Sequence, residues 1–237
     1  MPASPEALLF DLDGVLVDSR AAITASINHA LERMGLPRQP ETSLHRFIGP
    51  PLGAALGTLL DELGADPAQA PRAVALYRER YREHCVAETP LFPGIREALT
   101  ALRGRVPLAV ATSKPTAFAR PILEARGIAE LFDCIEGPSL DPDGEPKERT
   151  VARALEGLGM RPVPPGRVVL VGDRRHDVEA ARAHGLLPVG VAWGIGTEEE
   201  LRRAGAARIL REPADLVGLL APDSSSGVPA KLGGRAL

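Results

Sequence analysis

Short runs of apolar residues, each about four residues long, constrain the fold of this chain more than any other feature. Strands that are buried on both faces of a parallel sheet have such unbroken apolar runs. Helical patterns separate the runs, and strands that alternate with helices are typical of a parallel α/β sheet with right-handed crossovers. The sequence therefore predicts a Rossmann-like α/β core. The expected strands are residues 7–10, 108–111, 168–171 and 188–191, with 208–210 as a weaker candidate.

Two apolar stripes and one capping pattern indicate helices of this core. Apolar residues fall on one helical face in residues 95–102 and again in residues 151–158. Thr197 begins a capping box, in which the Thr197 side chain accepts from the backbone of Glu200 and the Glu200 carboxylate reaches back to the cap. A further helix is therefore expected to begin at this point.

One long stretch breaks the alternation, because no strand-like run is found between residues 19 and 89. Ser19 is a candidate N-cap for a helix with an apolar stripe in residues 23–34, and a second stripe falls in residues 74–85. The charged residues Arg78, Glu79, Arg80, Arg82 and Glu83 are interpreted as the solvated surface of that second helix. The stretch is expected to be a helical insertion after the first strand.

The domain organisation follows from these patterns. We expect a discontinuous α/β catalytic core at residues 1–18 and 90–221, and a helical cap domain at residues 19–89. Residues 222–237 have little apolar surface to bury, and we expect them to form a flexible tail.

The charge balance and the cysteine content exclude several classes of protein. Lys and Arg number 28 and Asp and Glu number 31, so no basic field is available to hold a nucleic acid polymer or an anionic membrane. The first residues do not read as a signal peptide, and no apolar run approaches the roughly 18 residues of a membrane span. Two isolated cysteines fit a reducing compartment. We expect a cytoplasmic protein that is a monomer or a homodimer.

Polar residues follow three of the expected strands at the point where each strand ends. Asp11 and Asp13 follow the first, Thr112 and Ser113 follow the second, and Asp173 follows the third. The carboxyl ends of parallel strands meet at one edge of the sheet, where open α/β sheets bind ligands. Carboxylates gathered there repel one another unless a cation joins them, and carboxylate oxygens suit Mg²⁺. The sequence therefore predicts a Mg²⁺ site at this edge.

Residues 10–19, Thr112, Lys147 and residues 172–177 form an ordered series of motifs. The first reads Phe-Asp-Leu-Asp-Gly-Val-Leu-Val-Asp-Ser, and the last reads Gly-Asp-Arg-Arg-His-Asp. In order and in strand context the series resembles the four motifs of the haloacid dehalogenase-like superfamily. The segment Phe-Ile-Gly-Pro-Pro-Leu at 47–52 and the run from 172 to 196 are similar to its phosphoglycolate phosphatase-like and 5′-nucleotidase-like subgroup. The helical insertion stands where this superfamily carries its C1 cap.

The resemblance assigns roles to the residues of the series. It implies that Asp11 is the nucleophile, which forms an aspartyl-phosphate, and that Asp13 is the general acid and base. Thr112 and Lys147 are implied to assist them in catalysis. The implied phosphate-binding residues are Gly14, Thr112, Ser113 and Lys147. The implied holders of Mg²⁺ are Asp11, the Asp13 backbone carbonyl, Asp173 and Asp177, the last either as a ligand or as a residue that orients the ligands.

Lysine is scarce in this chain, and its positions bear on the site. Arg supplies nearly all of the positive charge, and only Lys114, Lys147 and Lys231 are lysines. Lys147 stands where the resemblance needs a compact point charge beside a phosphate, which a bulkier guanidinium would not replace. No role is assigned to Lys114, which follows Thr112 and Ser113.

The cap is expected to determine the substrate, through residues 45–50. Arg46 is expected to meet an anionic group of the substrate, and Gly49 to lie at the site, when the cap closes over the core and excludes water. His176 is interpreted as a structural or exposed histidine. Trp193 is interpreted as a packing residue or as part of the edge of the site.

Asp13 discriminates most among the activities of the superfamily. Relatives that release a halide or a carbanion lack an acid at this position, so a proton donor there implies an alkoxide leaving group. We expect a Mg²⁺-dependent phosphatase that acts on a small phosphorylated metabolite. The alternatives are a sugar phosphomutase on the same core and a non-enzymatic receiver-type module that is phosphorylated on Asp11. The sequence leaves phosphoglycolate-like and nucleoside 5′-monophosphate-like substrates both open.

Overall fold

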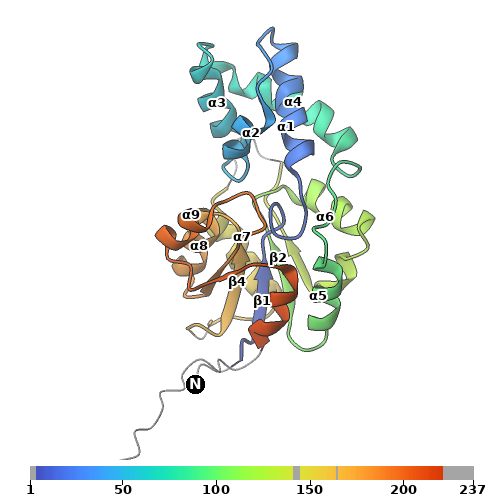
Figure 1. Cartoon of the computed structure of the whole chain (residues 1–237), viewed down its shortest axis with the longest axis vertical. Helices are drawn as coiled ribbons and strands as arrows, with labels where there is room; N and C mark the ends of the chain where they lie inside the picture. The colour runs from blue at the N-terminus through green and yellow to red at the C-terminus, as the bar shows by residue number, and fades with distance from the viewer. Residues whose placement is uncertain (1–3, 141–144, 164, 221–237) are drawn as a thin grey trace, which may run out of the picture.

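A computed structural model describes residues 4–140, 145–163 and 165–220 of the chain (Figure 1). The expected tail at 222–237, including Lys231, lies outside the described residues. Within them, six strands form one sheet in the order β3-β2-β1-β4-β5-β6, and every neighbouring pair is parallel. The strands are β1 Ala7–Phe10, β2 Leu108–Ala111, β3 Cys134–Glu136, β4 Val168–Gly172, β5 Leu187–Val191 and β6 Arg208–Leu210. The expected α/β fold class is confirmed.

The helices fall into an early group and a later group. The early group is α1 Arg20–Arg33, α2 Glu41–Leu44, α3 Leu52–Glu62 and α4 Ala70–His84. The later group is α5 Ile95–Leu102, α6 Thr116–Ala125, α7 Lys147–Gly157, α8 Arg175–Ala183 and α9 Glu198–Ala204. Short 3₁₀ helices cover His45–Phe47, Pro67–Gln69, Ala129–Leu131 and Pro213–Leu220.

Alternate side chains of the strands enter two different cores, one on each face of the sheet. Leu8 and Phe10 of β1 belong to one core, and Leu9 belongs to the other. Apolar residues of α5 and α6 complete the first core, and apolar residues of α7 and α8 complete the second. The sheet is therefore covered on both faces, as its unbroken apolar strands require.

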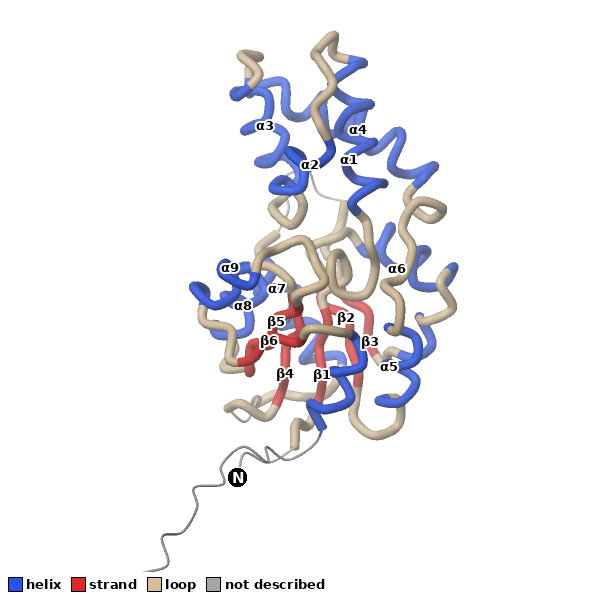
Figure 2. The backbone as a smooth tube through the Cα atoms, viewed as in Figure 1, coloured by secondary structure: helices blue, strands red, loops and turns tan. Residues whose placement is uncertain are grey.

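The early helices lie together beyond the carboxyl end of the sheet (Figures 1 and 2). Helix α4 packs against both α1 and α3. The apolar stripes expected at 23–34 and 74–85 point inward, since Ile27 and Tyr81 among others are buried. We call helices α1 to α4 and their connections the helical cap. The domain boundaries at 18/19 and 89/90 stay a prediction.

Two capping expectations differ from the structure. Ser19 stands at the N-cap position of α1, but its side chain makes no capping hydrogen bond. The Thr197 side chain does accept from the Glu200 backbone N at 3.1 Å. The Glu200 carboxylate, however, accepts from Arg174 Nε at 3.0 Å and from the Arg175 backbone N at 2.9 Å. A charged donor offers this carboxylate a stronger bond than the backbone of the cap does, so the reciprocal half of the capping box was wrong.

Strand β3 was missing from the sequence prediction. Its three residues include the half-buried Cys134 and Glu136, with only Ile135 fully buried. Because β3 is the edge strand next to β2, one of its long sides has no neighbouring strand to bury it. The unbroken apolar run that identified the other strands is therefore absent here.

Candidate active site

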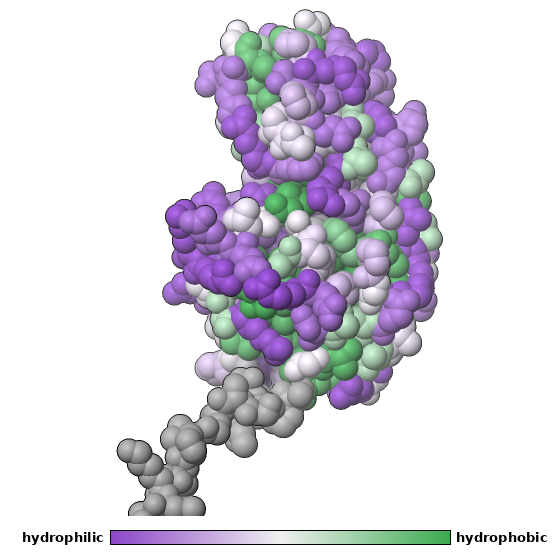
Figure 3. Space-filling view, viewed as in Figure 1, coloured by the Kyte–Doolittle hydropathy of each residue, from purple (hydrophilic) through white to green (hydrophobic). Residues whose placement is uncertain are grey.

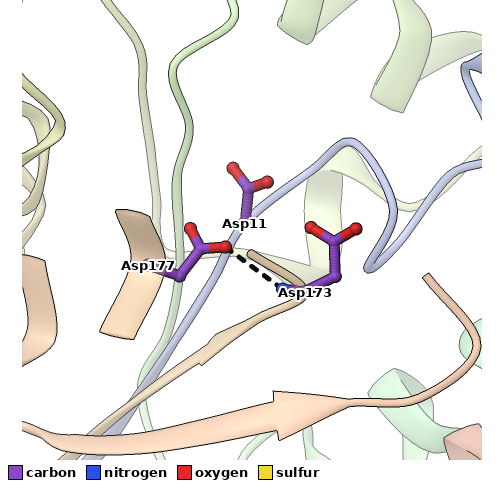
Figure 4. Close-up of side chains that lie close together, drawn as sticks. All are labelled: Asp11, Asp173 and Asp177. Atoms are coloured by element: carbon purple, nitrogen blue, oxygen red, sulfur yellow. Dashed lines mark hydrogen bonds between the residues drawn. The ribbon is translucent and has the colours of Figure 1, made fainter. Parts of the chain in front are cut away.

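Three aspartates from different elements meet at the carboxyl end of the sheet (Figure 4). Asp11 follows β1 and Asp173 follows β4, its neighbour in the sheet, while Asp177 lies in the first turn of α8. All three are buried, and a carboxylate oxygen of each lies within 4.8 Å of the others. The edge of the sheet that the sequence indicated therefore does gather carboxylates.

Asp177 holds the backbone that carries Asp173. Its Oδ2 accepts from the backbone N of Asp173 at 3.1 Å and of Arg174 at 2.9 Å. Gly172 permits this close approach, since a Cβ at that position would lie 2.1 Å from the Cβ of Asp177. One oxygen of Asp177 therefore orients the loop after β4, and the other faces the aspartate cluster.

Asp173 is held in turn by two loops. Its Oδ2 accepts from the Ile195 backbone N at 2.7 Å. Gly14 lies against the same carboxylate, with φ of +86°, and a Cβ there would lie 2.1 Å from Asp173 Oδ2. The Trp193 indole donates to the Val15 carbonyl at 3.0 Å, which joins the two loops. The sequence had not assigned Ile195; the glycines on both sides of it were the available signal.

Asp11 and Asp13 are each paired with a different lysine. Lys147, the first residue of α7, places its Nζ 2.7 Å from Asp11 Oδ1, and it also contacts Asp177 Oδ1. Lys114, on the loop after β2, places its Nζ 2.8 Å from Asp13 Oδ2. Both lysines are buried. Lys114, to which the sequence assigned no role, is therefore part of the site.

Thr112 and Ser113 form the loop between β2 and Lys114. The Thr112 hydroxyl is buried and accepts from the Lys114 backbone N at 3.1 Å. Both residues line a small pocket that Asp11, Asp13 and Lys147 also line. The structure thus brings the expected phosphate-binding residues of this loop to the same place as the expected nucleophile.

Burial and mutual repulsion change the acidity of these groups. Burial raises the pKa of Asp11 to about 6, with the neighbouring charges of Asp177 and Asp13 acting in the same direction and Lys147 opposing them. Burial, Asp177 and Asp11 raise the pKa of Asp173 well above its usual value. Burial alone would lower the pKa of Lys147, but Asp11 and Asp177 raise it above its usual value. Lys147 is therefore a permanent cation.

The carboxylates of this cluster fit a divalent cation. Four aspartates, at positions 11, 13, 173 and 177, gather around two lysine ammonium groups, and their mutual repulsion is what a bound divalent cation would relieve. The buried Oδ1 atom of Asp173 has no hydrogen-bond partner among the described residues. Clustered carboxylate oxygens are hard ligands of the kind that Mg²⁺ takes.

A cavity of about 490 Å³ lies beside the small pocket and between the helical cap and the sheet. The surface is hollowed in this region (Figure 3). Asp13, Ser113, Lys147, Ile48, Gly49 and His176 line both spaces. Much of the remaining wall is apolar, from Ile23, Phe47, Leu52, Pro115 and Phe118. A ligand with its phosphate at Asp11 would extend into this cavity past Asp13.

Of the two cap residues that the sequence indicated, Gly49 lies at the site, as expected, and Arg46 does not. Arg46 is exposed, stacks on the Phe47 ring and pairs with Glu62, and it lines neither space. Arg78, assigned to a solvated face, lines the cavity and donates to the Leu140 carbonyl at 3.3 Å. The difference arises because the helix containing residue 78 turns that side of its surface toward the core.

His176, interpreted from the sequence as a structural or exposed histidine, lies at the site. It is half-buried, lines both spaces and has its Nδ1 3.5 Å from Glu179. Its position follows from that of Asp177, since both belong to the first turn of α8.

The sheet and its aspartate–lysine cluster define a class of enzymes that act on phosphate esters at the carboxyl end of an α/β core. The haloacid dehalogenase-like hydrolase family matches this chain over residues 8–191. This chain belongs to that family. The resemblance inferred from the motifs is therefore confirmed.

Two similar proteins are named for the hydrolysis of phosphate esters, and a third is named a kinase. A 5′-nucleotidase of Pseudomonas aeruginosa is 41% identical over 196 residues, covering 82% of this chain and 86% of the relative. A phosphoglycolate phosphatase of Chromobacterium violaceum is 30% identical over 219 residues, covering 91% and 96%. The tyrosine-protein kinase PtkA of Mycobacterium tuberculosis is 42% identical over 194 residues, covering 81% of this chain and 64% of the relative.

A solved structure supports the fold. The crystal structure of a predicted phosphatase from Clostridium acetobutylicum superposes with a TM-score of 0.81 and 34% identity, covering 91% of this chain and 97% of the other. Together with the family, the 5′-nucleotidase, the phosphoglycolate phosphatase and this structure place the chain among hydrolases of phosphoric monoesters, which decides against the receiver-type alternative. No helix in the described ranges is long and apolar enough to cross a membrane.

Proposed function

We propose that this chain is a Mg²⁺-dependent phosphatase that hydrolyses a small phosphate monoester through an aspartyl-phosphate on Asp11. The observation that carries the proposal is the position of Asp11, 2.7 Å from the Lys147 ammonium and at the centre of a buried carboxylate cluster. A nucleophilic carboxylate needs such a cation, because an anion that attacks a phosphate is otherwise repelled by it.

The first half of the reaction transfers the phosphoryl group to the protein. A carboxylate oxygen of Asp11 attacks phosphorus, and the bond from phosphorus to the ester oxygen breaks. Asp13 donates its proton to that leaving oxygen, which departs as an alcohol. Thr112 and Ser113 bind phosphate oxygens, and Lys147 neutralises charge between the phosphate and Asp11.

The second half returns Asp11 to its starting state. Asp13, now a carboxylate, removes a proton from water, and the water oxygen attacks the phosphorus of the aspartyl-phosphate. The bond from phosphorus to the Asp11 oxygen breaks, and inorganic phosphate leaves. Mg²⁺ held by Asp11, the Asp13 carbonyl and Asp173, with Asp177 orienting the loop, would supply Lewis-acid stabilisation of the phosphate charge.

The size and lining of the cavity beside Asp13 indicate which class of phosphate ester, and therefore which alcohol leaving group, it can hold. A two-carbon acid would occupy little of about 490 Å³, which is within the range of pockets that enclose drug-sized ligands. Its wall is largely apolar, with Lys114, Lys147, Arg78 and His176 as cationic or titratable groups and Asp13, Glu145, Glu148 and Glu179 as carboxyl groups. These features support a nucleoside 5′-monophosphate-like substrate over a phosphoglycolate-like one.

A phosphate-release assay over a panel of esters tests the proposal. Nucleoside 5′-monophosphates, phosphoglycolate and a hexose bisphosphate are compared with Mg²⁺ and with EDTA. We expect Mg²⁺-dependent release, fastest from a nucleoside 5′-monophosphate. Release from no ester would contradict the proposed reaction, and release from phosphoglycolate alone would contradict the substrate class. Isomerisation of a hexose phosphate without release would identify the phosphomutase alternative.

The proposal includes a cytoplasmic location and a monomeric or homodimeric state. Subcellular fractionation tests the first, and light scattering coupled to size-exclusion chromatography tests the second. A membrane fraction or a larger assembly would contradict them.

A further inference from the structure

We propose that Lys114 is a positioning residue for the acid and base Asp13, and that Tyr81 of the helical cap completes its binding site. The inference rests on the proposed function, since it assumes that Asp13 transfers the proton to the leaving group. It assigns a role to the second lysine of the site and to a tyrosine that belongs to the cap.

The contacts of Lys114 select one oxygen of Asp13. The ammonium lies 2.8 Å from Asp13 Oδ2, in a position where both side chains are largely buried. The other oxygen, Oδ1, is buried and has no hydrogen-bond partner among the residues that the structure describes. Because one oxygen is held by the lysine, the carboxylate plane is restrained and Oδ1 stays available for the leaving group.

Tyr81 holds the ammonium from the opposite side. Lys114 Nζ donates to the Tyr81 hydroxyl at 2.5 Å and lies 4.9 Å from the centre of the Tyr81 ring. A cation near an aromatic face gains stabilisation when it is desolvated, as it is here. Lys114 is thus bound between a carboxylate of the core and a phenol of the cap.

The Tyr81 ring is itself fixed by both parts of the molecule. It stacks on Tyr77 of α4 with ring centres 5.1 Å apart, and it meets the edge of Phe118 of α6 with centres 5.2 Å apart. At the other end, the Lys114 backbone N is bound by the Thr112 hydroxyl. The lysine therefore has little freedom, and its position depends on the cap lying against the core.

A positioned proton donor matters most for esters with a poor leaving group. An alkoxide must be protonated as it departs, whereas p-nitrophenolate is stable enough to leave with little help. Loss of positioning should therefore slow the cleavage of alkyl phosphates far more than that of p-nitrophenyl phosphate. A substitution that only disturbs the fold would slow both alike.

The experiment measures kcat/KM, which reports formation of the aspartyl-phosphate, for alkyl phosphates and for aryl phosphates of increasing leaving-group acidity. Lys114→Met is expected to lose about 100-fold on the alkyl esters and less than about threefold on p-nitrophenyl phosphate, since general acid catalysis contributes 10²–10⁴-fold. Tyr81→Phe keeps the ring and loses only the hydroxyl. It should show the same selectivity with a loss of about three- to tenfold on the alkyl esters.

Two further variants control for charge and stability. Lys114→Arg keeps the charge and should recover part of the alkyl activity. Arg80→Met removes a cation from α4 that pairs with Glu88 at 2.6 Å, away from Asp13. It should leave the ratio of alkyl to aryl activity at the wild-type value, even if its melting temperature falls.

The possible outcomes separate this inference from the proposed function. Equal losses on alkyl and aryl esters would overturn the positioning role, and so would a change confined to KM, which would identify Lys114 as a substrate-binding residue. No phosphate release by the wild-type protein, or full activity of Asp11→Asn, would overturn the proposed function itself. Selective loss in both Lys114→Met and Tyr81→Phe, with an active wild type, supports the inference.

Discussion

Lys147 Nζ lies 2.7 Å from Asp11 Oδ1, although the two residues come from the start of a helix and the end of a strand far apart in the sequence. The same ammonium contacts Asp177 at the beginning of α8. One buried cation therefore joins β1, α7 and α8 at the point where the sheet ends.

Replacing Lys147 by arginine should lower kcat by about 100-fold, the cost typical of losing one group that stabilises transition-state charge. The side chain is buried between two carboxylates, and a planar guanidinium is too large for the space of an ammonium. Steady-state kinetics on the best substrate measures the effect. Arg149→Lys, an exposed exchange on the same helix, is the control and should stay within twofold. Near-normal kcat in Lys147→Arg would show that only charge is needed.

Gly14→Ala should destabilise the protein and abolish most activity. A Cβ at Gly14 would lie 2.1 Å from Asp173 Oδ2, and its φ of +86° is strained for alanine. Gly35→Ala is the matched control, because Gly35 has φ of +77° and a Cβ added there would meet nothing within 4 Å. We expect Gly14→Ala to lose about 1–3 kcal/mol more than Gly35→Ala in denaturant unfolding, because only the methyl group at Gly14 would clash with a neighbour. Equal losses would mean that backbone strain alone matters.

Asp11 should make the stability of the metal-free protein depend on pH. Its pKa is raised from 3.8 to about 6, so the folded state binds this proton more tightly than the unfolded chain does. The resulting stabilisation is present below about pH 4 and is lost as the pH rises through 6. Asp11→Asn cannot ionise, so its melting temperature relative to wild type in EDTA should increase from pH 4 to pH 7. A constant difference would contradict the raised pKa.

Mg²⁺ should stabilise the folded protein through Asp173. Binding to the native state alone raises the melting temperature. We expect millimolar Mg²⁺ to raise it by a few degrees over an EDTA sample of equal ionic strength, and Asp173→Asn to remove most of this shift. Differential scanning fluorimetry measures both without an activity assay. An undiminished shift in Asp173→Asn would place the Mg²⁺ elsewhere.

Local patterns in the sequence were sufficient to predict the position of most strands of the sheet. Strands β1, β2 and β6 have the bounds that the apolar runs indicated, and β4 and β5 differ by one residue. The edge strand β3 was missed, because it has a neighbouring strand on one side only and two of its three residues are half-buried. Asp11, Thr112 and Asp173 could be identified because each directly follows a strand, and Asp13 because it lies two residues beyond Asp11; the ends of parallel strands converge.

The partners of the charged side chains could not be predicted in this way. Arg46 was expected at the site and pairs with Glu62 instead, while Arg78 lines the cavity. The Glu200 carboxylate accepts a hydrogen bond from Arg174 instead of from the backbone at the start of its own helix. A long charged side chain reaches whichever opposite charge the packing of distant elements brings near it, and helical periodicity alone does not say which helix faces which.

The sequence by itself determined the alternation of strands and helices and the order of the residues at the strand ends, because burial on both faces of a sheet acts on each strand locally. Only the tertiary structure decided that Lys114 pairs with Asp13 and that Tyr81 of the cap holds it. That arrangement depends on how the helical cap packs against the core. It therefore arises from contacts between residues far apart in the chain, which no local pattern encodes.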